Sequence, residues 1–172
     1  NVIGTANLVK LSIEHDVKKF VLVSTDKAVK PINVMGATKR LAELICQGAN
    51  TSYSTRFMSV RFGNVLGSSG SVIPKFKRQI QEGGPVTVTD KKAERFFMTI
   101  KEAAQLVMQS QSISINGIIF LDMGSPKNIY DIAKKIILAS GLSYKDRYDQ
   151  DGEIEIIETG LRKGEKLTEK LY

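Results

Sequence analysis

The stretch VLVSTDKAVKPINVMGATKRLAEL, residues 21–44, places ionisable side chains directly after an apolar run. Its first residues are strand formers, and a helical pattern begins at Met35. Successive side chains of a strand point to opposite faces, so Thr25, Asp26 and Lys27 can converge only where the strand gives way to a loop. In open α/β sheets, ligands bind at this carboxyl end of the strands. The stretch therefore predicts a strand, a ligand-binding turn and a helix.

A surface turn is the simpler interpretation of the same residues. Aspartate is common in turns and lysine is common on surfaces. Met35 and Lys39 stand four residues apart and share a helix face, but methionine more often fills a core than builds a site. Taken alone, these residues favour the ordinary turn, and only the combination of several motifs favours a site.

Length and composition indicate an ordinary globular protein. The 172 residues suffice for one domain with a core, and 42% hydrophobic and 25% charged residues are globular values. No apolar run is long enough to span a bilayer, and Asn1 opens no signal peptide. Cys46 and His15 are the only residues of their kinds, so we expect no disulfide, no metal site and a reducing, cytoplasmic location. An N-terminal anchor outside this chain would place it at the cytoplasmic face of the inner membrane.

The net charge of +7 has three explanations: a solvated basic surface, an anionic small ligand, or nucleic acid. The lysines are scattered along the chain, and only 7% of the residues are aromatic. Nucleic acid is therefore the least favoured partner, because single strands bind to aromatic platforms set among basic residues. We expect no nucleic-acid partner and no membrane contact from this chain.

Apolar periodicity predicts strands alternating with helices, which is typical of α/β architecture with a largely parallel sheet. The short apolar runs at 20–23 and 118–121 predict strands buried on both faces. Asn128 is expected to cap a helix that stops at Gly141. The expected helices lie at 2–13, 35–47, 73–80, 99–107 and 129–140, and the expected strands at 20–23, 57–62, 86–89, 118–121 and 154–157.

A glycine-rich nucleotide-binding turn is missing from this pattern. The strand, G-x-G-x-x-G and helix that open a doubly wound nucleotide-binding domain do not occur, and the loop at 63–70 has the wrong glycine spacing. The sequence therefore predicts the C-terminal part of a doubly wound, Rossmann-like parallel sheet at residues 1–70, with its glycine-rich half outside this chain. Residues 71–172 are expected to form mainly a smaller α/β substrate-binding region, with segments that return to the main sheet.

The motifs, taken in order, resemble a known superfamily. Ser24-Thr-Asp-Lys followed by Asn33-Val-Met-Gly-Ala-Thr-Lys39-Arg resembles the extended short-chain dehydrogenase/reductases. Within that superfamily, the chain is similar to the UDP-N-acetylglucosamine 4,6-dehydratases of capsular polysaccharide biosynthesis. Most members carry tyrosine where this chain has Met35, but a subgroup of the dehydratases has methionine there, as this chain does. Lys163 stands where proline is usual. The other matching stretches are residues 1–5, 61–68, 95–100 and 160–166.

The resemblance implies a lyase that uses tightly bound NAD. Such an enzyme oxidises C4 of the sugar, removes the C5 proton, expels water from C6 and returns the hydride to C6. By resemblance, Asp26 is the acid, Lys27 is the base, and Thr25 donates a hydrogen bond at O4. Because Met35 has no hydroxyl, the group that takes the O4 proton stays open between Asp26 and Thr25 acting through water.

The resemblance also implies binding roles. Lys39 is expected to hold the nicotinamide ribose, with Ser24 and Phe62 on the cofactor side. A guanidinium suits phosphate oxygens, which favours Arg95 and Arg162 at the diphosphate, although a surface ion pair is the commoner role of an arginine. Glu165 is expected to hold ribose hydroxyls or Arg162. The substrate-binding residues expected from family position are Asn64, Val72, Ile73, Pro74, Thr87, Thr89, Arg95, Arg162 and Glu165.

Two other functions remain open at this point. A UDP-sugar 4-epimerase is the alternative within the superfamily, although epimerisation needs no elimination acid and base of the kind that Asp26 and Lys27 would supply. A non-catalytic nucleotide-sugar-binding fragment is the alternative from another class. Without the glycine-rich half, we expect this chain alone to bind NAD weakly and to be inactive. The complete protein is expected to be a homo-oligomer that binds a UDP-sugar, with the helix after Met35 as a candidate interface.

Overall fold

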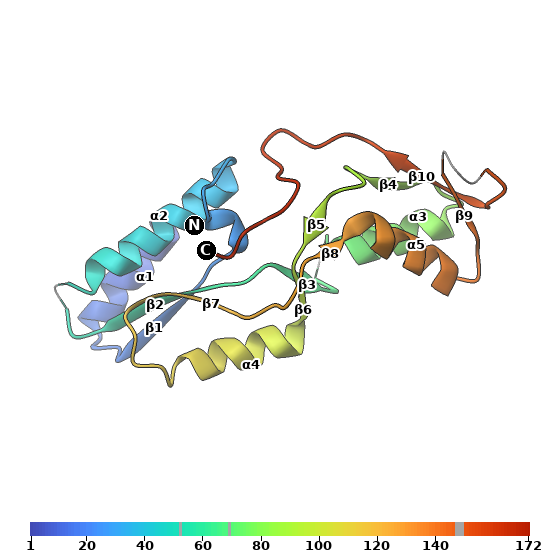
Figure 1. Cartoon of the computed structure of the whole chain (residues 1–172). Coiled ribbons are helices and arrows are strands. Elements are labelled where there is room, and N and C mark those ends of the chain that lie inside the picture. Colours follow the sequence, from blue (N-terminus) through green and yellow to red (C-terminus); the bar gives the residue numbers. More distant parts are fainter. Residues whose placement is uncertain (52, 69, 147–149) are drawn as a thin grey trace. The chain divides into compact units, whose positions relative to one another are not determined.

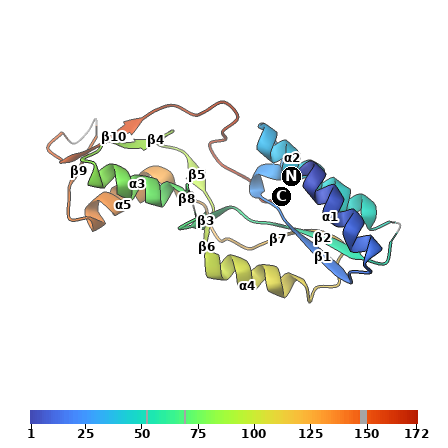
Figure 2. The ribbon, with the colours of Figure 1, turned by 180° about the vertical axis from the view of Figure 1, so that it is seen from behind.

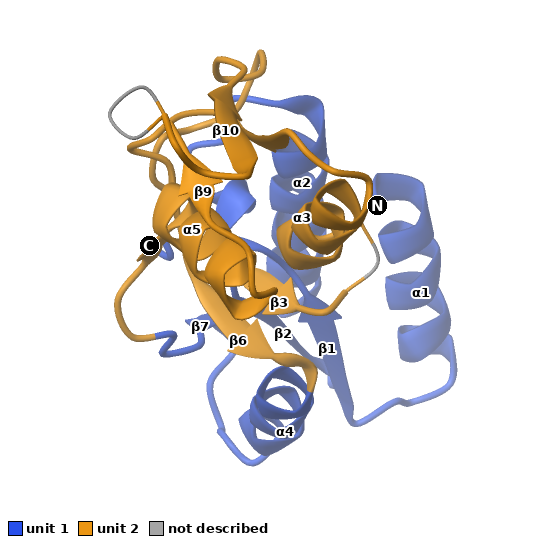
Figure 3. Cartoon of the chain, turned by 90° about the vertical axis from the view of Figure 1, so that its right-hand side faces the viewer, with its two compact units in different colours: residues 1–63, 101–123, 170–172 blue, residues 64–100, 124–169 orange. Residues whose placement is uncertain are grey.

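The computed structural model describes residues 1–51, 53–68, 70–146 and 150–172, and its chain forms two compact units (Figure 3). Unit 1 comprises residues 1–63, 101–123 and 170–172. Unit 2 comprises residues 64–100 and 124–169. The chain thus passes from unit 1 into unit 2 twice and returns to unit 1 each time.

Unit 1 is a three-layer α/β arrangement around a parallel sheet. The strands β1, β2 and β7 pair in the order β1-β2-β7, with every pairing parallel. Helices α1 and α2 lie on one face of this sheet and α4 lies on the opposite face (Figures 1 and 2). A core that includes Val9, Leu22 and Phe57 packs the helices onto the strands. The elements are α1 (Val2–Glu14), β1 (Lys19–Val23), η1 (Asp26–Ala28), α2 (Val34–Ala49), β2 (Arg56–Arg61), α4 (Ile100–Ser110) and β7 (Gly117–Phe120).

Unit 2 is built from short strands and two helices. Strand β10 pairs in parallel with both β4 and β9, β3 pairs in parallel with β6, and β5 is antiparallel to β8. Phe76, Ala133 and Ile137 are fully buried in its core. The elements are β3 (Asn64–Leu66), α3 (Val72–Gln81), β4 (Val86–Val88), β5 (Glu94–Arg95), β6 (Phe97–Thr99), β8 (Lys127–Asn128), α5 (Ile129–Ala139), β9 (Tyr144–Lys145) and β10 (Ile154–Glu158).

The α/β class and the largely parallel pairing are confirmed, and so are several local signals. Asn128 caps α5, since its Oδ1 accepts a hydrogen bond from the Asp131 N–H at 3.1 Å. Gly141, at φ +78°, follows the end of that helix in the left-handed conformation that glycine adopts without steric cost. None of the helices in the described ranges is long and apolar enough to cross a membrane.

Three expectations about burial and structure were wrong. Strands β1 and β7 are not buried on both faces, because Val23 and Phe120 are exposed and only Leu22 is buried within the pair of strands. The stretch 63–70 is not wholly a loop, since β3 occupies part of it; Ser69 lies outside the described residues. Apolar periodicity also predicts one face of α2 with Ala37, Leu41, Leu44 and Ile45, but of these four residues only Ile45 packs against the core. Leu41 and Leu44 are 49% and 46% exposed, whereas the buried residues are Gly36, Ala42, Glu43, Cys46 and Ala49.

Candidate active site

The predicted turn lies at the carboxyl end of β1, as its sequence indicates. The Ser24 N–H donates to Val60 O at 2.8 Å, and the Asp26 N–H donates to Phe62 O at 3.1 Å, so the chain stays beside β2 just past the strand. A 3₁₀ turn then begins at Asp26, and Thr25 caps it by accepting the Lys27 N–H on its Oγ1 at 3.4 Å. The break in the ladder lets three consecutive side chains share one place.

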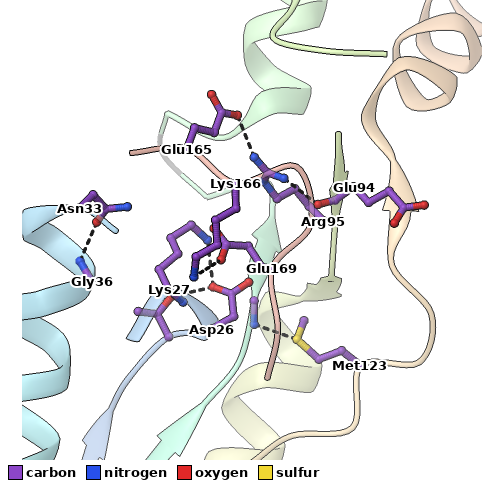
Figure 4. A network of polar contacts seen from close by, with 12 residues as sticks. Asp26, Lys27, Asn33, Gly36, Glu94, Arg95, Met123, Glu165, Lys166 and Glu169 are labelled. Carbon is purple, nitrogen blue, oxygen red and sulfur yellow. Dashed lines mark hydrogen bonds and ion pairs between the residues drawn. The ribbon is translucent and has the colours of Figure 1, made fainter. Parts of the chain in front are cut away.

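The side chains of Lys27 and Thr25 converge on one oxygen of the Asp26 carboxylate, and Figure 4 shows the contact between Lys27 and Asp26. Lys27 Nζ and Thr25 Oγ1 each donate to Asp26 Oδ1 at 2.9 Å. Asp26 is fully buried, and its other oxygen, Oδ2, has no hydrogen-bond partner among the described residues. A buried carboxylate oxygen without a partner costs about 1–3 kcal/mol or more, which is typical of a group reserved for function.

The first turns of α2 pack directly against this 3₁₀ turn. Asn33 caps the helix by accepting the Gly36 N–H on Oδ1 at 2.8 Å (Figure 4). A Cβ at Gly36 would lie 2.3 Å from Lys27 O, so only glycine permits this approach. One turn later, Lys39 Nζ donates to Val23 O at 3.0 Å. Met35 is 45% exposed and therefore does not fill the core, which was the simpler interpretation of that residue.

A buried carboxylate that the sequence interpretation missed lies one turn further along α2. Glu43 is 0% exposed; it accepts Ser24 Oγ at 2.6 Å and both Arg61 Nε and Nη2 at 2.7 Å. Arg40 Nη1 donates to the same carboxylate at 2.9 Å. Burial alone would raise the pKa of Glu43, but the hydrogen bonds from Arg61, Ser24 and Arg40 outweigh it and hold that pKa below its ordinary value. The Ser24 hydroxyl donates its hydrogen bond to Glu43, and the cofactor-binding role of Ser24 stays a prediction.

The spacing of Gly36, Lys39 and Glu43 was the signal available for this face of the helix. Residues three and four apart lie on one helix face, so the three residues form a continuous row. Apolar periodicity ignores such a row, because it contains a glycine and two charged residues. The row nevertheless contacts the 3₁₀ turn at Lys27, the end of β1 at Val23 and Ser24, and the end of β2 at Arg61.

Within unit 2, Arg95 forms a buried group with Glu165 (Figure 4). Arg95 Nη2 donates to Glu165 Oε1 at 2.7 Å, and Thr89 Oγ1 donates to the same oxygen at 2.9 Å. Arg95 Nη1 also donates to the carbonyls of Glu94 and Leu167, at 2.7 and 2.9 Å. Arg95 is thus not in a surface ion pair. Glu165 meets Arg162 through the backbone N–H of Arg162, at 3.2 Å, and the Arg162 side chain lies on the surface.

The remaining predicted substrate residues are also in unit 2. Val72, Ile73 and Pro74 form the first turn of α3, and Asn64 begins β3. Thr87 is bound to α3, since Gln79 Nε2 donates to its Oγ1 at 2.9 Å and Lys75 Nζ donates to its carbonyl at 3.4 Å. Burial, followed by the positive charges of Arg162 and Arg78, lowers the pKa of Lys75 although Glu165 opposes this. The sequence interpretation did not include Lys75 or Gln79.

This architecture and the Thr-Asp-Lys turn after β1 are those expected of an extended short-chain dehydrogenase/reductase. In the part of the chain that the structure describes, no three metal-ligating side chains gather into a metal site. The chain belongs to a family described as polysaccharide biosynthesis protein, whose model matches residues 1–172.

Three curated relatives are similar to nearly the whole of this chain. The capsular polysaccharide biosynthesis protein CapD of Staphylococcus aureus is 53% identical over 99% of this chain and 28% of its own length. An inverting UDP-N-acetylglucosamine 4,6-dehydratase of Campylobacter jejuni is 36% identical over 98% of this chain and 48% of its own length. A UDP-glucose 4-epimerase of Rickettsia rickettsii is also 36% identical, over 99% and 48%. The chain therefore spans about half or less of these relatives.

Solved structures confirm the fold. Pen from Bacillus thuringiensis is 38% identical, with a TM-score of 0.85 over 99% of this chain and 51% of that one. DesIV from Streptomyces venezuelae, a dTDP-glucose 4,6-dehydratase solved with NAD and TYD bound, is 19% identical. Its TM-score is 0.84 over 100% of this chain and 56% of that chain, a likeness in fold alone. Relatives of this chain thus include both sugar dehydratases and sugar epimerases.

Proposed function

We propose that the complete protein is an NAD-dependent 4,6-dehydratase, a hydro-lyase that converts UDP-N-acetylglucosamine into a UDP-4-keto-6-deoxy sugar for bacterial polysaccharide or glycan biosynthesis. The observation that carries this proposal is the group formed by Thr25, Asp26 and Lys27. Elimination of water needs an acid and a base close together, and the Asp26 Oδ1–Lys27 Nζ distance is 2.9 Å. The chain covers only part of its relatives' length, so the activity is proposed for the full-length protein.

The residues present at the end of β1 fit the nicotinamide end of NAD. An ammonium has three N–H donors, and Lys39 gives one of them to Val23 O, which orients the group and leaves donors for ribose hydroxyls. Phe62 and Ser24 flank the same strand ends. When bound, NAD supplies the hydride acceptor for C4 and the hydride donor for C6. NAD is bound in the DesIV structure, which shares this fold.

The Asp26–Lys27 pair can hold its shared proton in two ways. With the proton on Lys27 the pair is an ion pair; with the proton on Asp26 the pair is a neutral acid beside a neutral amine. From the neutral arrangement, Lys27 takes the C5 proton while Asp26 gives its proton to the C6 hydroxyl, which leaves as water. The pair ends as the ion pair.

The proton balance closes over one turnover. Lys27 returns its proton to C5 when the hydride arrives at C6. The site gains one proton from O4 during oxidation and loses one proton with the expelled water, so the number of protons in the site is unchanged. At the end of a turnover Asp26 is a carboxylate, because its proton has left with water. We propose that it accepts the O4 proton of the next substrate, directly or through Thr25 and a water molecule, since Met35 has no hydroxyl; this restores the neutral acid beside the neutral amine.

We propose that the UDP portion binds to residues of unit 2. Arg162 has a side chain on the surface and a backbone tied to Glu165, so its guanidinium is available to a diphosphate. Arg95, held by Glu165, contributes a second, fixed guanidinium. The other proposed contacts are Asn64, Val72, Ile73, Pro74, Thr87 and Thr89.

The direct test is to incubate the full-length protein with UDP-N-acetylglucosamine in deuterated water and to follow the product by NMR. A dehydratase gives a 4-keto-6-deoxy sugar with deuterium at C5, because a base has removed the C5 proton. A product that keeps its C6 hydroxyl and is inverted at C4 would identify an epimerase, the activity of the Rickettsia relative. No turnover with tight UDP-sugar binding would identify a binding protein.

We also propose that the full-length protein is a homo-oligomer that uses α1 and α2 as its interface. Large apolar side chains are exposed on both helices. Leu44→Glu is expected to shift the protein toward monomers, because a charge would be buried without a partner. Light scattering after size exclusion measures the mass, with the exposed Lys18→Glu in the same unit as the control. An unchanged oligomer in Leu44→Glu would exclude this face. The exposed residues are Ile3, Leu8, Leu11, Val34, Met35, Leu41 and Leu44.

We further propose that the protein acts in the cytoplasm. The single cysteine of this chain, Cys46, is a buried free thiol, as is usual for proteins of a reducing compartment. Burial, aided by the negative charge of Glu43, raises the pKa of this thiol to about 11, so the thiol is unreactive near neutral pH.

A further inference from the structure

The Glu43 carboxylate joins three elements of unit 1. It projects from α2 and meets Ser24 at the end of β1 and Arg61 at the end of β2. All three side chains are buried: Glu43 is 0% exposed, Ser24 4% and Arg61 9%. The two contacts with Arg61, both 2.7 Å, form the bidentate pairing that fixes the orientation of a guanidinium and a carboxylate most strictly.

Both partners of Glu43 are immediate neighbours of the segments that hold Asp26. Ser24 directly precedes the cap residue Thr25, and its backbone N–H is bound to Val60 O. Arg61 directly precedes Phe62, whose carbonyl accepts the Asp26 N–H at 3.1 Å. A shift of either Ser24 or Arg61 therefore moves one of the two backbone segments between which Asp26 is held.

The same helix face makes two other contacts with this turn. Lys39, one turn before Glu43, binds Val23 O, and Gly36 packs against Lys27 O. Glu43 is thus the last of three anchors along one face of α2. It is also the one that reaches both strands, because its Oε1 accepts from Ser24 Oγ at the end of β1 and from Arg61 Nε at the end of β2.

We propose that Glu43 is a positioning residue for the reaction: through Ser24 and Arg61 it holds the 24–28 turn, and with it Asp26 and Lys27, in the geometry that elimination requires. This inference rests on the proposed dehydratase function. It assigns no direct contact between Glu43 and substrate or cofactor.

A purely structural role makes a different prediction. Buried ion pairs often contribute little net stability, and replacing both charges by apolar side chains of similar size is often neutral or stabilising. If Glu43 and Arg61 only held the fold together, a stable apolar replacement would restore activity. If they position the turn, stability would return but catalysis would not, since Ser24 loses its acceptor and the strand ends lose their shared anchor.

The test is the double variant E43M/R61M of the full-length protein, compared with wild type and with K10M/E14M, which removes an exposed ion pair of the same unit. We expect E43M/R61M to unfold at nearly the wild-type temperature. Its kcat for dehydration should fall by about 10²-fold, the loss expected for a misplacement of the reacting groups, while KM for UDP-N-acetylglucosamine changes little. K10M/E14M should match wild type in both constants.

Amide hydrogen exchange provides a second measurement that needs no turnover. The N–H groups of Asp26, Ala28 and Val29 all donate to backbone carbonyls. In E43M/R61M these amides should exchange about tenfold faster or more, whereas the amide of Leu22 inside β1 should be unchanged. Should the double variant fail to fold, E43Q keeps the shape of the side chain and one acceptor oxygen, and the same exchange pattern is expected.

A normal kcat together with unchanged exchange at Asp26 and Ala28 would overturn the proposal. If wild type produces no 4-keto-6-deoxy sugar, the proposed function fails, and the exchange measurement still decides whether Glu43 holds the turn. Faster exchange spread evenly over unit 1 would show a structural role and would also overturn the proposal.

Discussion

Lys27→Ala in the full-length protein is expected to lower kcat for dehydration by about 10²–10⁴-fold, the usual contribution of a general acid–base group. Lys27 Nζ lies 2.9 Å from Asp26 Oδ1, and its loss removes both the base for the C5 proton and the partner of a buried carboxylate. KM for UDP-N-acetylglucosamine should change much less, because the proposed UDP contacts belong to unit 2. Product formation followed by NMR measures the effect.

Lys27→Arg separates a base from a simple positive charge. Arginine keeps the charge beside Asp26 but is not deprotonated in proteins, so this variant should be nearly as inactive as Lys27→Ala. Lys18→Ala, at an exposed position in the same unit, is the control and should behave as wild type. Substantial dehydration by Lys27→Arg would exclude Lys27 as the base that removes the C5 proton.

Gly36→Ala is expected to destabilise the protein and to lower its activity strongly. The new Cβ would lie 2.3 Å from Lys27 O and 3.2 Å from both Lys27 C and Pro31 Cβ. An ordinary glycine-to-alanine change inside a helix gains up to about 1 kcal/mol, but overpacking against backbone costs about 1–3 kcal/mol, so the steric term decides the sign. The backbone of Lys27 must then move, and kcat should fall by about 10²-fold.

Gly48→Ala is the matched control, because it makes the same substitution in the same helix where nothing lies within 4 Å of the new Cβ. It should stabilise the protein by up to about 1 kcal/mol in denaturant unfolding and leave kcat unchanged. If Gly36→Ala were as stable and as active as Gly48→Ala, the close approach of α2 to the Lys27 backbone would not be required for stability or for activity.

Local chemistry made the main helices, the longer strands and the turn predictable from the sequence. The run before Ser24 is strongly strand-forming, Asn33 and Asn128 are cap residues, and a hydroxyl, a carboxylate and an amine directly after a strand can meet only in a turn. The positions of Thr25, Asp26 and Lys27 around one carboxylate oxygen follow from that break in the ladder. By contrast, the two-residue strands β5, β8 and β9 escaped prediction because they are too short to show a period.

The sequence by itself determined the α/β class, the order of the principal elements and the composition of the Thr-Asp-Lys turn. Only the tertiary structure decided which face of α2 is buried and what holds the turn in place. Apolar periodicity pointed to Leu41 and Leu44, yet the face that meets the strand ends contains Gly36 and Glu43. The physical reason is that close packing of a helix against backbone needs the absence of a side chain at Gly36. A buried charge such as Glu43 is tolerated only beside partners, here Ser24 and Arg61, that lie far away in the sequence.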